Sequence, residues 1–195
     1  YERVVAIEID KGLIPILEKT MAEYDNVTVI NADVMEVDLA ALVEKYSEGR
    51  PVSVCANLPY YITTPILMRL LESGVRFSSI TVMVQKEVAL RMAARPGTAD
   101  YGAFTVFCQY YATPELLFDV PPHCFMPQPK VTSAVVSLRV RQQRPWDIPD
   151  QELFFRVVRS SFAMRRKKLS NGLAAGFPEL GKDGAAAVIA DCGFD

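Results

Sequence analysis

The chain has 195 residues, of which 50% are hydrophobic and 23% charged, with a formal net charge of −2 and four cysteines. This composition is typical of a soluble globular protein of one domain or slightly more. No run approaches the roughly 20 apolar residues of a membrane helix, so a membrane-spanning protein is excluded and no membrane partner is expected. The scattered cysteines lack a C-x-x-C pair, which favours reduced thiols in a cytoplasmic protein over a zinc site.

Strand and helix patterns alternate along the first 140 residues. In chain order they predict a strand at 4–9, a helix at 13–24, a strand at 27–30, a helix at 38–46, a strand at 52–56, a helix at 63–71, a strand at 79–84, helices at 86–94 and 102–112, and strands at 116–120 and 131–140. Asp10 is expected to cap the first helix and Pro15 to lie in its first turn. The alternation predicts an α/β fold with a mainly parallel sheet covered on both faces and an antiparallel edge formed by the last two strands.

After Pro145-Trp146 the pattern becomes helical and basic. We therefore expect a first domain at residues 1–145 and a second, α-helical domain that begins in residues 146–195. Residues 1–129 hold 10 Lys and Arg against 16 Asp and Glu, whereas residues 130–182 hold 11 against 4. A basic segment on an acidic body indicates contact with a polyanion, although a solvated charged face gives the same pattern.

Polar side chains follow three of the predicted strands. Glu8, Asp33 and Asn57 lie where the first, second and third strands end. In an open parallel sheet, ligands bind beyond the carboxyl ends of the strands, so this coincidence predicts a binding site there. A carboxylate at the first strand end suits a ribose diol, and Asp33 could accept from the exocyclic amine of a base. Each carboxylate could instead cap the next helix or turn.

The third strand ends in Asn57-Leu58-Pro59-Tyr60. Pro59 fixes its own φ and biases Leu58 towards an extended conformation. The Asn57 side-chain oxygen and the Leu58 carbonyl could then act as paired acceptors for an aromatic –NH₂ group, which leaves the nitrogen lone pair free. Tyr60 offers a flat face on which a base can stack. A strand-terminal turn with incidental aromatic residues is the alternative, and only the position at a strand end favours the site.

Two later segments are further candidates. A proline-rich loop at residues 124–131 could present Phe125 as a second stacking face, unless that ring fills the core. Four cations, Arg165, Arg166, Lys167 and Lys168, are expected to end an amphipathic helix, where they suit phosphate contact or compensate the helix dipole. The single histidine, His123, has no triad partner at a suitable spacing, and neither a Gly-rich phosphate loop nor a metal-ligand cluster is present, so hydrolase chemistry and a metal centre are not expected.

Together these segments resemble the ribosomal RNA adenine N6-dimethyltransferases. That family comprises the KsgA enzymes, which dimethylate two adjacent adenines near the 3′ end of small-subunit rRNA, and their Erm relatives. Seven segments match the family's pattern in order, namely VVAIEID, NADVMEVD, NLPYYITTPIL, MVQKEVALRM, YGAFTVFCQYY, ELLFDVPPHCFMPQPKVTSAVVSL and SSFAMRRKKLSNGL. The resemblance covers almost the whole chain, and the amino-acid sequence of the sixth segment favours KsgA over Erm.

The resemblance implies a Rossmann-like class I methyltransferase fold that uses S-adenosylmethionine without a metal, followed by part of a small helical RNA-binding domain. It implies that Glu8 binds the cofactor ribose and Asp33 the cofactor adenine, with Ile9 and Val34 as apolar neighbours. Asn57 and the Leu58 carbonyl would hold the target N6, and Asn57 would also border the cofactor. Tyr60 and Phe125 would enclose a flipped adenine. The cations at 165–168 would contact 16S rRNA in the precursor of the 30S subunit.

In one respect the sequence departs from the family. A basic tail, a first strand and a Gly-rich cofactor loop are expected before Tyr1, and the helical domain is expected to continue beyond Asp195. The family's first strand lies between the strands at 4–9 and 52–56. We therefore expect this chain to be a fragment that binds the cofactor weakly or not at all and that forms strand-exchanged oligomers.

Three other functions fit part of the pattern. An Erm-like enzyme would methylate 23S rRNA. A DNA adenine methyltransferase uses a related motif, although the segments around Phe125 and Arg165 favour RNA. A non-catalytic RNA-binding or ribosome-assembly module would keep the fold without the reaction. The presence of Asn57, Tyr60 and Phe125 argues against such a module for a complete enzyme, but not for an inactive fragment.

Overall fold

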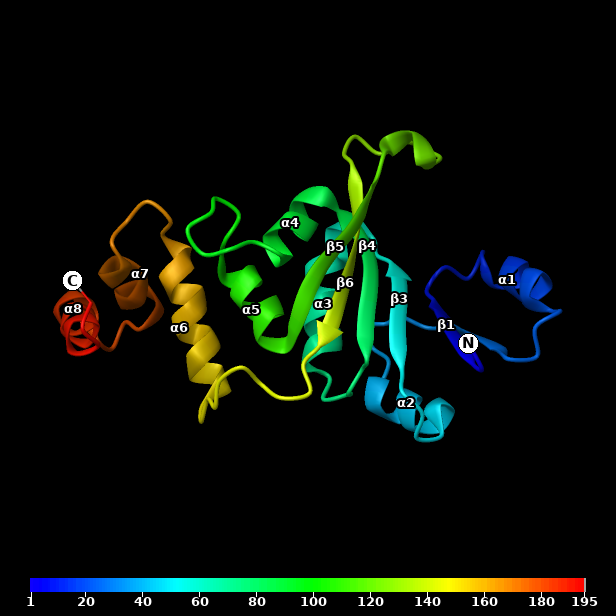
Figure 1. Ribbon diagram of the computed structural model, residues 1–195, viewed down its shortest axis with the longest axis horizontal. Coiled ribbons are helices and arrows are strands. Elements are labelled where there is room, and N and C mark those ends of the chain that lie inside the picture. Colours follow the sequence, from blue (N-terminus) through cyan, green and yellow to red (C-terminus); the bar gives the residue numbers. More distant parts are fainter. Residues whose placement is uncertain (195) are drawn as a thin grey trace.

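A computed structural model describes residues 1–194 and contains the strands and helices that the sequence predicts (Figure 1). The strands are β1 (Val4–Glu8), β2 (Val27–Asn31), β3 (Ser53–Asn57), β4 (Ser79–Gln85), β5 (Ala112–Val120) and β6 (Ser133–Val140). The α-helices are α1 (Ile14–Met21), α2 (Leu39–Ser47), α3 (Thr63–Glu72), α4 (Lys86–Met92), α5 (Ala103–Tyr111), α6 (Gln151–Ala163), α7 (Leu169–Gly176) and α8 (Gly181–Asp191). Short 3₁₀ turns occur at η1 (Tyr60–Ile62) and η2 (Pro122–Cys124). Every helix within residues 1–194 is too short or too polar to cross a membrane.

The strands form two sheets. One contains only the parallel pair β1–β2, and the other has the order β3-β4-β6-β5. β3 and β4 are parallel, whereas β6 runs antiparallel to both of its neighbours. The expected antiparallel edge is thus confirmed, but the four pairings divide evenly between parallel and antiparallel. Within residues 1–194, β1 and β3 do not pair, as expected from the place of the family's first strand between them.

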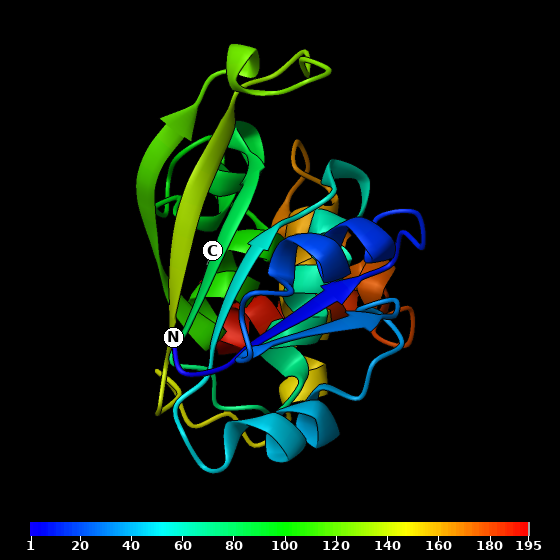
Figure 2. The same cartoon turned by 90° about the vertical axis from the view of Figure 1, so that its right-hand side faces the viewer.

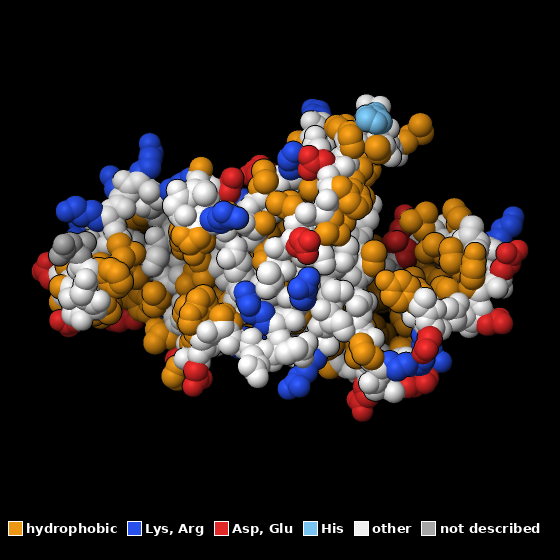
Figure 3. Space-filling view, viewed as in Figure 1, with side chains coloured by type: hydrophobic (Ala, Val, Ile, Leu, Met, Phe, Trp, Pro, Cys, Tyr) orange, Lys and Arg blue, Asp and Glu red, His pale blue; other side chains and the backbone are white. Residues whose placement is uncertain are grey.

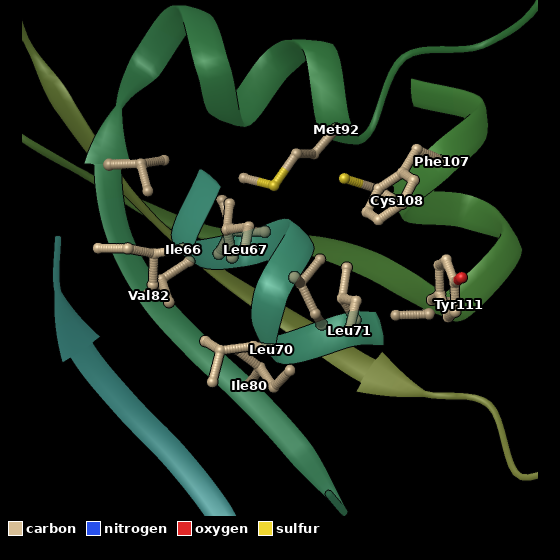
Figure 4. Close-up of a cluster of buried hydrophobic side chains, with 14 of the residues drawn as sticks. Ile66, Leu67, Leu70, Leu71, Ile80, Val82, Met92, Phe107, Cys108 and Tyr111 are labelled. Carbon is tan, nitrogen blue, oxygen red and sulfur yellow. The ribbon is translucent and has the colours of Figure 1, made fainter. Parts of the chain in front are cut away.

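The main hydrophobic core lies between the four-stranded sheet and helices α3, α4 and α5 (Figure 4). Side chains of a strand alternate between its two faces. Ile80, Val82 and Val84 of β4 point into this core and are fully buried, whereas Thr81 and Met83 on the other face are only half-buried. Helices therefore close one face of this sheet, and the expectation of helices on both faces is wrong for the other face within residues 1–194.

The first two strands and α1 form a separate group beside β3 (Figure 2). None of the residues of β1, α1 or β2 is fully buried. The segment after β2 joins the group to the main body. Val34, Met35 and Val37 pack against the main core, and the Arg69 guanidinium of α3 donates to the carbonyls of Val34 (3.1 Å) and Val37 (2.7 Å).

The start of α1 differs from the sequence-based expectation. Asp10 does not cap this helix, whose N-cap residue is Leu13 and has no side-chain hydrogen bond. The Asp10 carboxylate instead accepts from the backbone N–H of Gly12 at 2.7 Å. An aspartate that bonds to a backbone N–H two residues on closes a turn, and here that turn precedes the helix. Pro15 lies in the first turn of α1 as expected.

The C-terminal helices pack in two steps. Phe155 of α6 belongs to the main core, with its ring 5.3 Å from that of Phe107. Helices α7 and α8 have a small cluster of their own, made of Leu173, Phe177 and Ala185. α6 and α7 approach closely at Gly176, which has no Cβ. A Cβ at this position would lie only 1.7 Å from the Ser160 hydroxyl oxygen. The first helix after the expected domain boundary at residue 146 is α6, and it packs into the main core of the preceding residues.

All four cysteines are free, and only Cys108 is buried. Burial raises the pKa of its thiol to about 12, against the opposing charge of Arg91. Cys108 is therefore a protonated core residue at neutral pH, in keeping with the reduced thiols expected from the sequence.

Candidate active site at the strand ends

Asn57 is the last residue of β3 and lies opposite Met83 of the neighbouring strand. Its side chain is exposed and makes no hydrogen bond within residues 1–194. The sequence predicted that this strand would stop at the amide, and this is confirmed. An amide oxygen without a partner at a strand end is free to accept a hydrogen bond from a ligand.

The segment after Asn57 is held by its backbone. The Leu58 N–H donates to the Met83 carbonyl at 3.2 Å, and the Leu58 side chain is buried in the main core. The Pro59 carbonyl accepts from the Thr63 hydroxyl at 3.0 Å and from the Ile62 N–H at 3.2 Å. No hydrogen bond within residues 1–194 reaches the Leu58 carbonyl. The loop thus presents a second free acceptor next to the Asn57 amide.

Tyr60 lies at the start of η1 and is half-buried. Its hydroxyl lies 2.6 Å from the hydroxyl oxygen of Ser133, the first residue of β6. The next residue, Tyr61, is 88% exposed. The two adjacent tyrosines therefore differ, since only the hydroxyl of Tyr60 is fixed by the fold.

At the end of β1, Glu8 closes a turn instead of capping α1. One of its carboxylate oxygens accepts from the Asp10 N–H at 2.7 Å, and the other has no partner within residues 1–194. The Asn31 side-chain amide donates to the carbonyls of Glu8 (2.8 Å) and Ile9 (3.3 Å). The side chain of Ile9 is exposed. Asn31 of β2 therefore fixes the backbone that carries both predicted cofactor residues of β1.

Asp33 follows β2 and also closes a turn. One oxygen of its carboxylate accepts from the Met35 N–H at 2.8 Å, and its carbonyl accepts from the N–H groups of Glu36 and Val37. The turn-capping alternative is therefore correct for one oxygen, while the other has no partner within residues 1–194. Val34 is half-buried against the main core.

Two groups of predicted residues result. Glu8, Ile9, Asp33 and Val34 lie at the ends of β1 and β2, and Asn57, Leu58 and Tyr60 lie at the end of β3. The first group lies together because the parallel strands β1 and β2 end at the same edge of their sheet, whereas the second group is one continuous segment. The two groups belong to different sheets, and the molecular surface is hollowed between β3 and the first two strands (Figure 3).

Phe125 follows η2 in the loop between β5 and β6, a loop that also contains a cis peptide bond between Met126 and Pro127. Its side chain is half-buried, so the core-filling alternative is wrong. Its ring stacks on no other aromatic ring within residues 1–194. Phe125 thus lies in the loop that leads into the same end of β6 as Ser133.

The basic segment differs from the expectation in its local structure. α6 ends at Ala163, so Arg165, Arg166, Lys167 and Lys168 lie in the connection to α7 and not on a helix end. Arg165 donates to the Ala99 carbonyl at 2.5 Å, and it lines a pocket together with Arg91. The other three side chains are exposed and make no ion pair within residues 1–194. Figure 3 shows Lys and Arg side chains standing out over this connection.

Three residues of the site were missed from the sequence: Asn31, Arg69 and Ser133. Each acts through a contact with a residue distant in sequence, and Ser133 is 73 residues from Tyr60. A polar residue at the end of a hydrophobic strand was the available signal, and both Asn31 and Ser133 carry it. Arg69, within an otherwise apolar run of the sequence, gave no comparable signal.

Comparison with known proteins identifies the family of the chain. A family model described as Ribosomal RNA adenine dimethylase matches residues 1–188. A relative from Alkaliphilus metalliredigens (strain QYMF), named Ribosomal RNA small subunit methyltransferase A, is 52% identical over 181 residues, which cover 93% of this chain and 63% of the relative. The chain spans about three fifths of the length of the first curated relatives it matches.

Solved structures share the fold. A dimethyladenosine transferase from Plasmodium falciparum superposes with a TM-score of 0.76 at 25% identity, over 91% of this chain and 62% of that one. The 23S rRNA methyltransferase ErmE superposes with a TM-score of 0.70 at 23% identity, over 99% of this chain and 73% of that one, which shows the fold alone. The fold is therefore the α/β fold of S-adenosylmethionine-dependent methyltransferases, and the chain belongs to the ribosomal RNA adenine dimethylase family.

Proposed function

We propose that this chain forms part of an S-adenosylmethionine-dependent enzyme that dimethylates the N6 atoms of two adjacent adenines of 16S rRNA. Its substrate would be the precursor of the 30S subunit, in the cytoplasm. The observation that carries the proposal is the pair of free acceptors at the end of β3, the Asn57 amide oxygen and the Leu58 carbonyl. Two acceptors can bind the two hydrogens of an –NH₂ group. The family is described as adenine dimethylases, and adenine carries such a group at N6.

The residues at the ends of β1 and β2 fit one half of the cofactor. Glu8 and Asp33 each keep one carboxylate oxygen without a partner within residues 1–194. These oxygens suit the ribose hydroxyls and the adenine amine, with Ile9 and Val34 as apolar neighbours. When bound, S-adenosylmethionine supplies a methyl group on a positively charged sulfur.

The chain's own residues would position the adenine. Asn57 and the Leu58 carbonyl would each accept one N6 hydrogen, which leaves the nitrogen lone pair directed at the methyl donor. Tyr60 and Phe125 would enclose the extruded base by stacking. Such a transfer depends mainly on position and needs no strong base. Arg166, Lys167 and Lys168, which are exposed in the helical part at 146–195, would contact RNA phosphates.

Two observations support the small-subunit substrate over the Erm alternative. The relative at 52% identity carries a small-subunit name, whereas the likeness to ErmE is limited to the fold. The test compares 30S subunits that lack the methylation with naked 23S rRNA as methyl acceptors, using the longest natural polypeptide that contains this sequence. Incorporation of labelled methyl groups into 16S rRNA alone is the expected result. Incorporation into 23S rRNA alone would contradict the proposal, and RNA binding without incorporation would identify the non-catalytic module.

We also propose that the 195-residue chain by itself forms oligomers through strand exchange. β1 and β3 each have one edge that pairs with no strand within residues 1–194, and Val4 and Ile9 are exposed beside the first of them. An open strand edge is a template for pairing with another chain. Light scattering on the 195-residue chain is expected to show a mass that rises with concentration, and a constant mass of 21.7 kDa would contradict this proposal.

A further inference from the structure

We propose that Ser133 is a positioning residue that holds the ring of Tyr60 in place through their hydroxyl–hydroxyl hydrogen bond. This inference rests on the proposed function, since it assigns Tyr60 the stacking role given above. Ser133 itself contacts neither substrate nor cofactor in this scheme.

The sheet order brings the two residues to the same edge. β6 runs antiparallel to β4, so its first residue, Ser133, pairs with the last residue of β4, Gln85. Asn57, the last residue of β3, pairs with Met83 of the same β4. The carboxyl ends of β3 and β4 and the start of β6 therefore lie side by side.

The segment after Asn57 folds across the end of β4 and is attached at two points. The Leu58 N–H donates to the Met83 carbonyl of β4 at 3.2 Å. Two residues later, the Tyr60 hydroxyl reaches the Ser133 hydroxyl oxygen of β6 at 2.6 Å. The first contact fixes the backbone that carries the acceptor pair, and the second fixes the far end of the tyrosine ring.

Ser133 is well placed for this role because it is buried and belongs to a strand inside the sheet. Its side chain is fully buried, and its strand is continued backwards by a hydrogen bond from the Lys86 N–H to the Thr132 carbonyl at 2.9 Å. A buried hydroxyl is costly without a partner, so the bond to Tyr60 is favoured over a free serine hydroxyl. A rigid partner of this kind reduces the freedom of the half-exposed ring.

The same bond relates the two proposed stacking faces. Phe125 lies in the loop that leads into β6, eight positions before Ser133. Because Tyr60 is bonded to the residue at which that loop becomes a strand, the position of the Tyr60 ring is set relative to the base of the Phe125 loop. The hydrogen bond thus contributes to the width of the space in which an adenine would stack.

The test is a double-mutant cycle with Ser133→Ala and Tyr60→Phe, measured as kcat and as KM for the cofactor and for RNA in the longest natural polypeptide that contains this sequence. Each single variant is expected to lower kcat about tenfold, with the KM for the cofactor unchanged. The double variant is expected to be no slower than the slower single variant, because both remove the same bond. Tyr61→Phe and Ser137→Ala, a neighbouring tyrosine and a serine on the same face of β6, are the matched controls and should keep full activity.

The outcomes separate the inference from the proposed function. Full activity of Tyr60→Phe would overturn the inference, whatever the effect of Ser133→Ala on folding. Additive losses in the double variant would also overturn it, since they indicate two independent structural roles. If Asn57→Ala and Tyr60→Ala were both fully active, the proposed function and the inference would fail together.

Discussion

Replacing Asn57 by alanine is expected to lower methyl transfer by about 10²- to 10³-fold, the usual loss when one preorganised hydrogen-bond partner of the reacting group is removed. The Asn57 side chain makes no hydrogen bond within residues 1–194, so its removal breaks no internal hydrogen bond. RNA affinity should be unchanged because phosphate contacts dominate it. Rates of methyl transfer and RNA dissociation constants at fixed salt concentration measure the two effects.

Two variants make this prediction specific. Asn57→Asp keeps an acceptor oxygen at the same position and should retain more activity than the alanine variant. Cys55→Ala changes an exposed side chain on the same face of the same strand and should be fully active. An Asn57→Ala protein that keeps more than about a tenth of the activity would exclude the amide from the role assigned to it.

Replacing Leu67 by alanine is expected to lower the free energy of unfolding by about 2–5 kcal/mol. Leu67 of α3 has no exposed surface and points from the helix towards the sheet in the centre of the main core (Figure 4). The loss combines the transfer free energy of the missing carbon atoms with the cavity that they leave. Urea unfolding followed by circular dichroism measures it, with the slope of the transition unchanged.

Leu90→Ala in α4 is the matched control, since that side chain is 39% exposed. Its loss should stay below about 1 kcal/mol. Equal losses for the two variants would mean that the core is not centred on α3. Because α3 directly follows the Asn57–Tyr60 segment, a weakened core at Leu67 should also lower activity through the position of that segment.

The local parts of the site could be predicted from the sequence. A β-branched run that stops at a polar residue marks a strand end, and Glu8, Asp33 and Asn57 all lie at or next to such ends. The order of the strands in the sheet was harder to predict. No local feature of the 131–140 segment indicates that this strand lies between β4 and β5. The even split of parallel and antiparallel pairings follows from that insertion.

Contacts between distant segments could not be predicted. The bond between Tyr60 and Ser133 and the bond between Arg165 and the Ala99 carbonyl each depend on how the elements pack in three dimensions. The helix that was expected to carry the four cations ends before them, since Met164 has already left helical geometry. Periodicity identifies α6 correctly, but it does not fix the last residue of a helix.

The first two strands and α1 have no fully buried residue, so this group is not expected to unfold together with the main core. Native-state hydrogen exchange reports local opening wherever little apolar surface opposes it. Amides of β1 and β2 will therefore exchange through openings that leave α3, β4 and β6 intact. The segment after β2, with its two hydrogen bonds from Arg69, and the ion pairs of Arg3 with Glu48 and of Glu2 with Arg50 join that group to the rest of the chain. For the 195-residue chain by itself, the strand ends that carry Glu8 and Asp33 are therefore expected to open at a lower free energy than the one that carries Asn57.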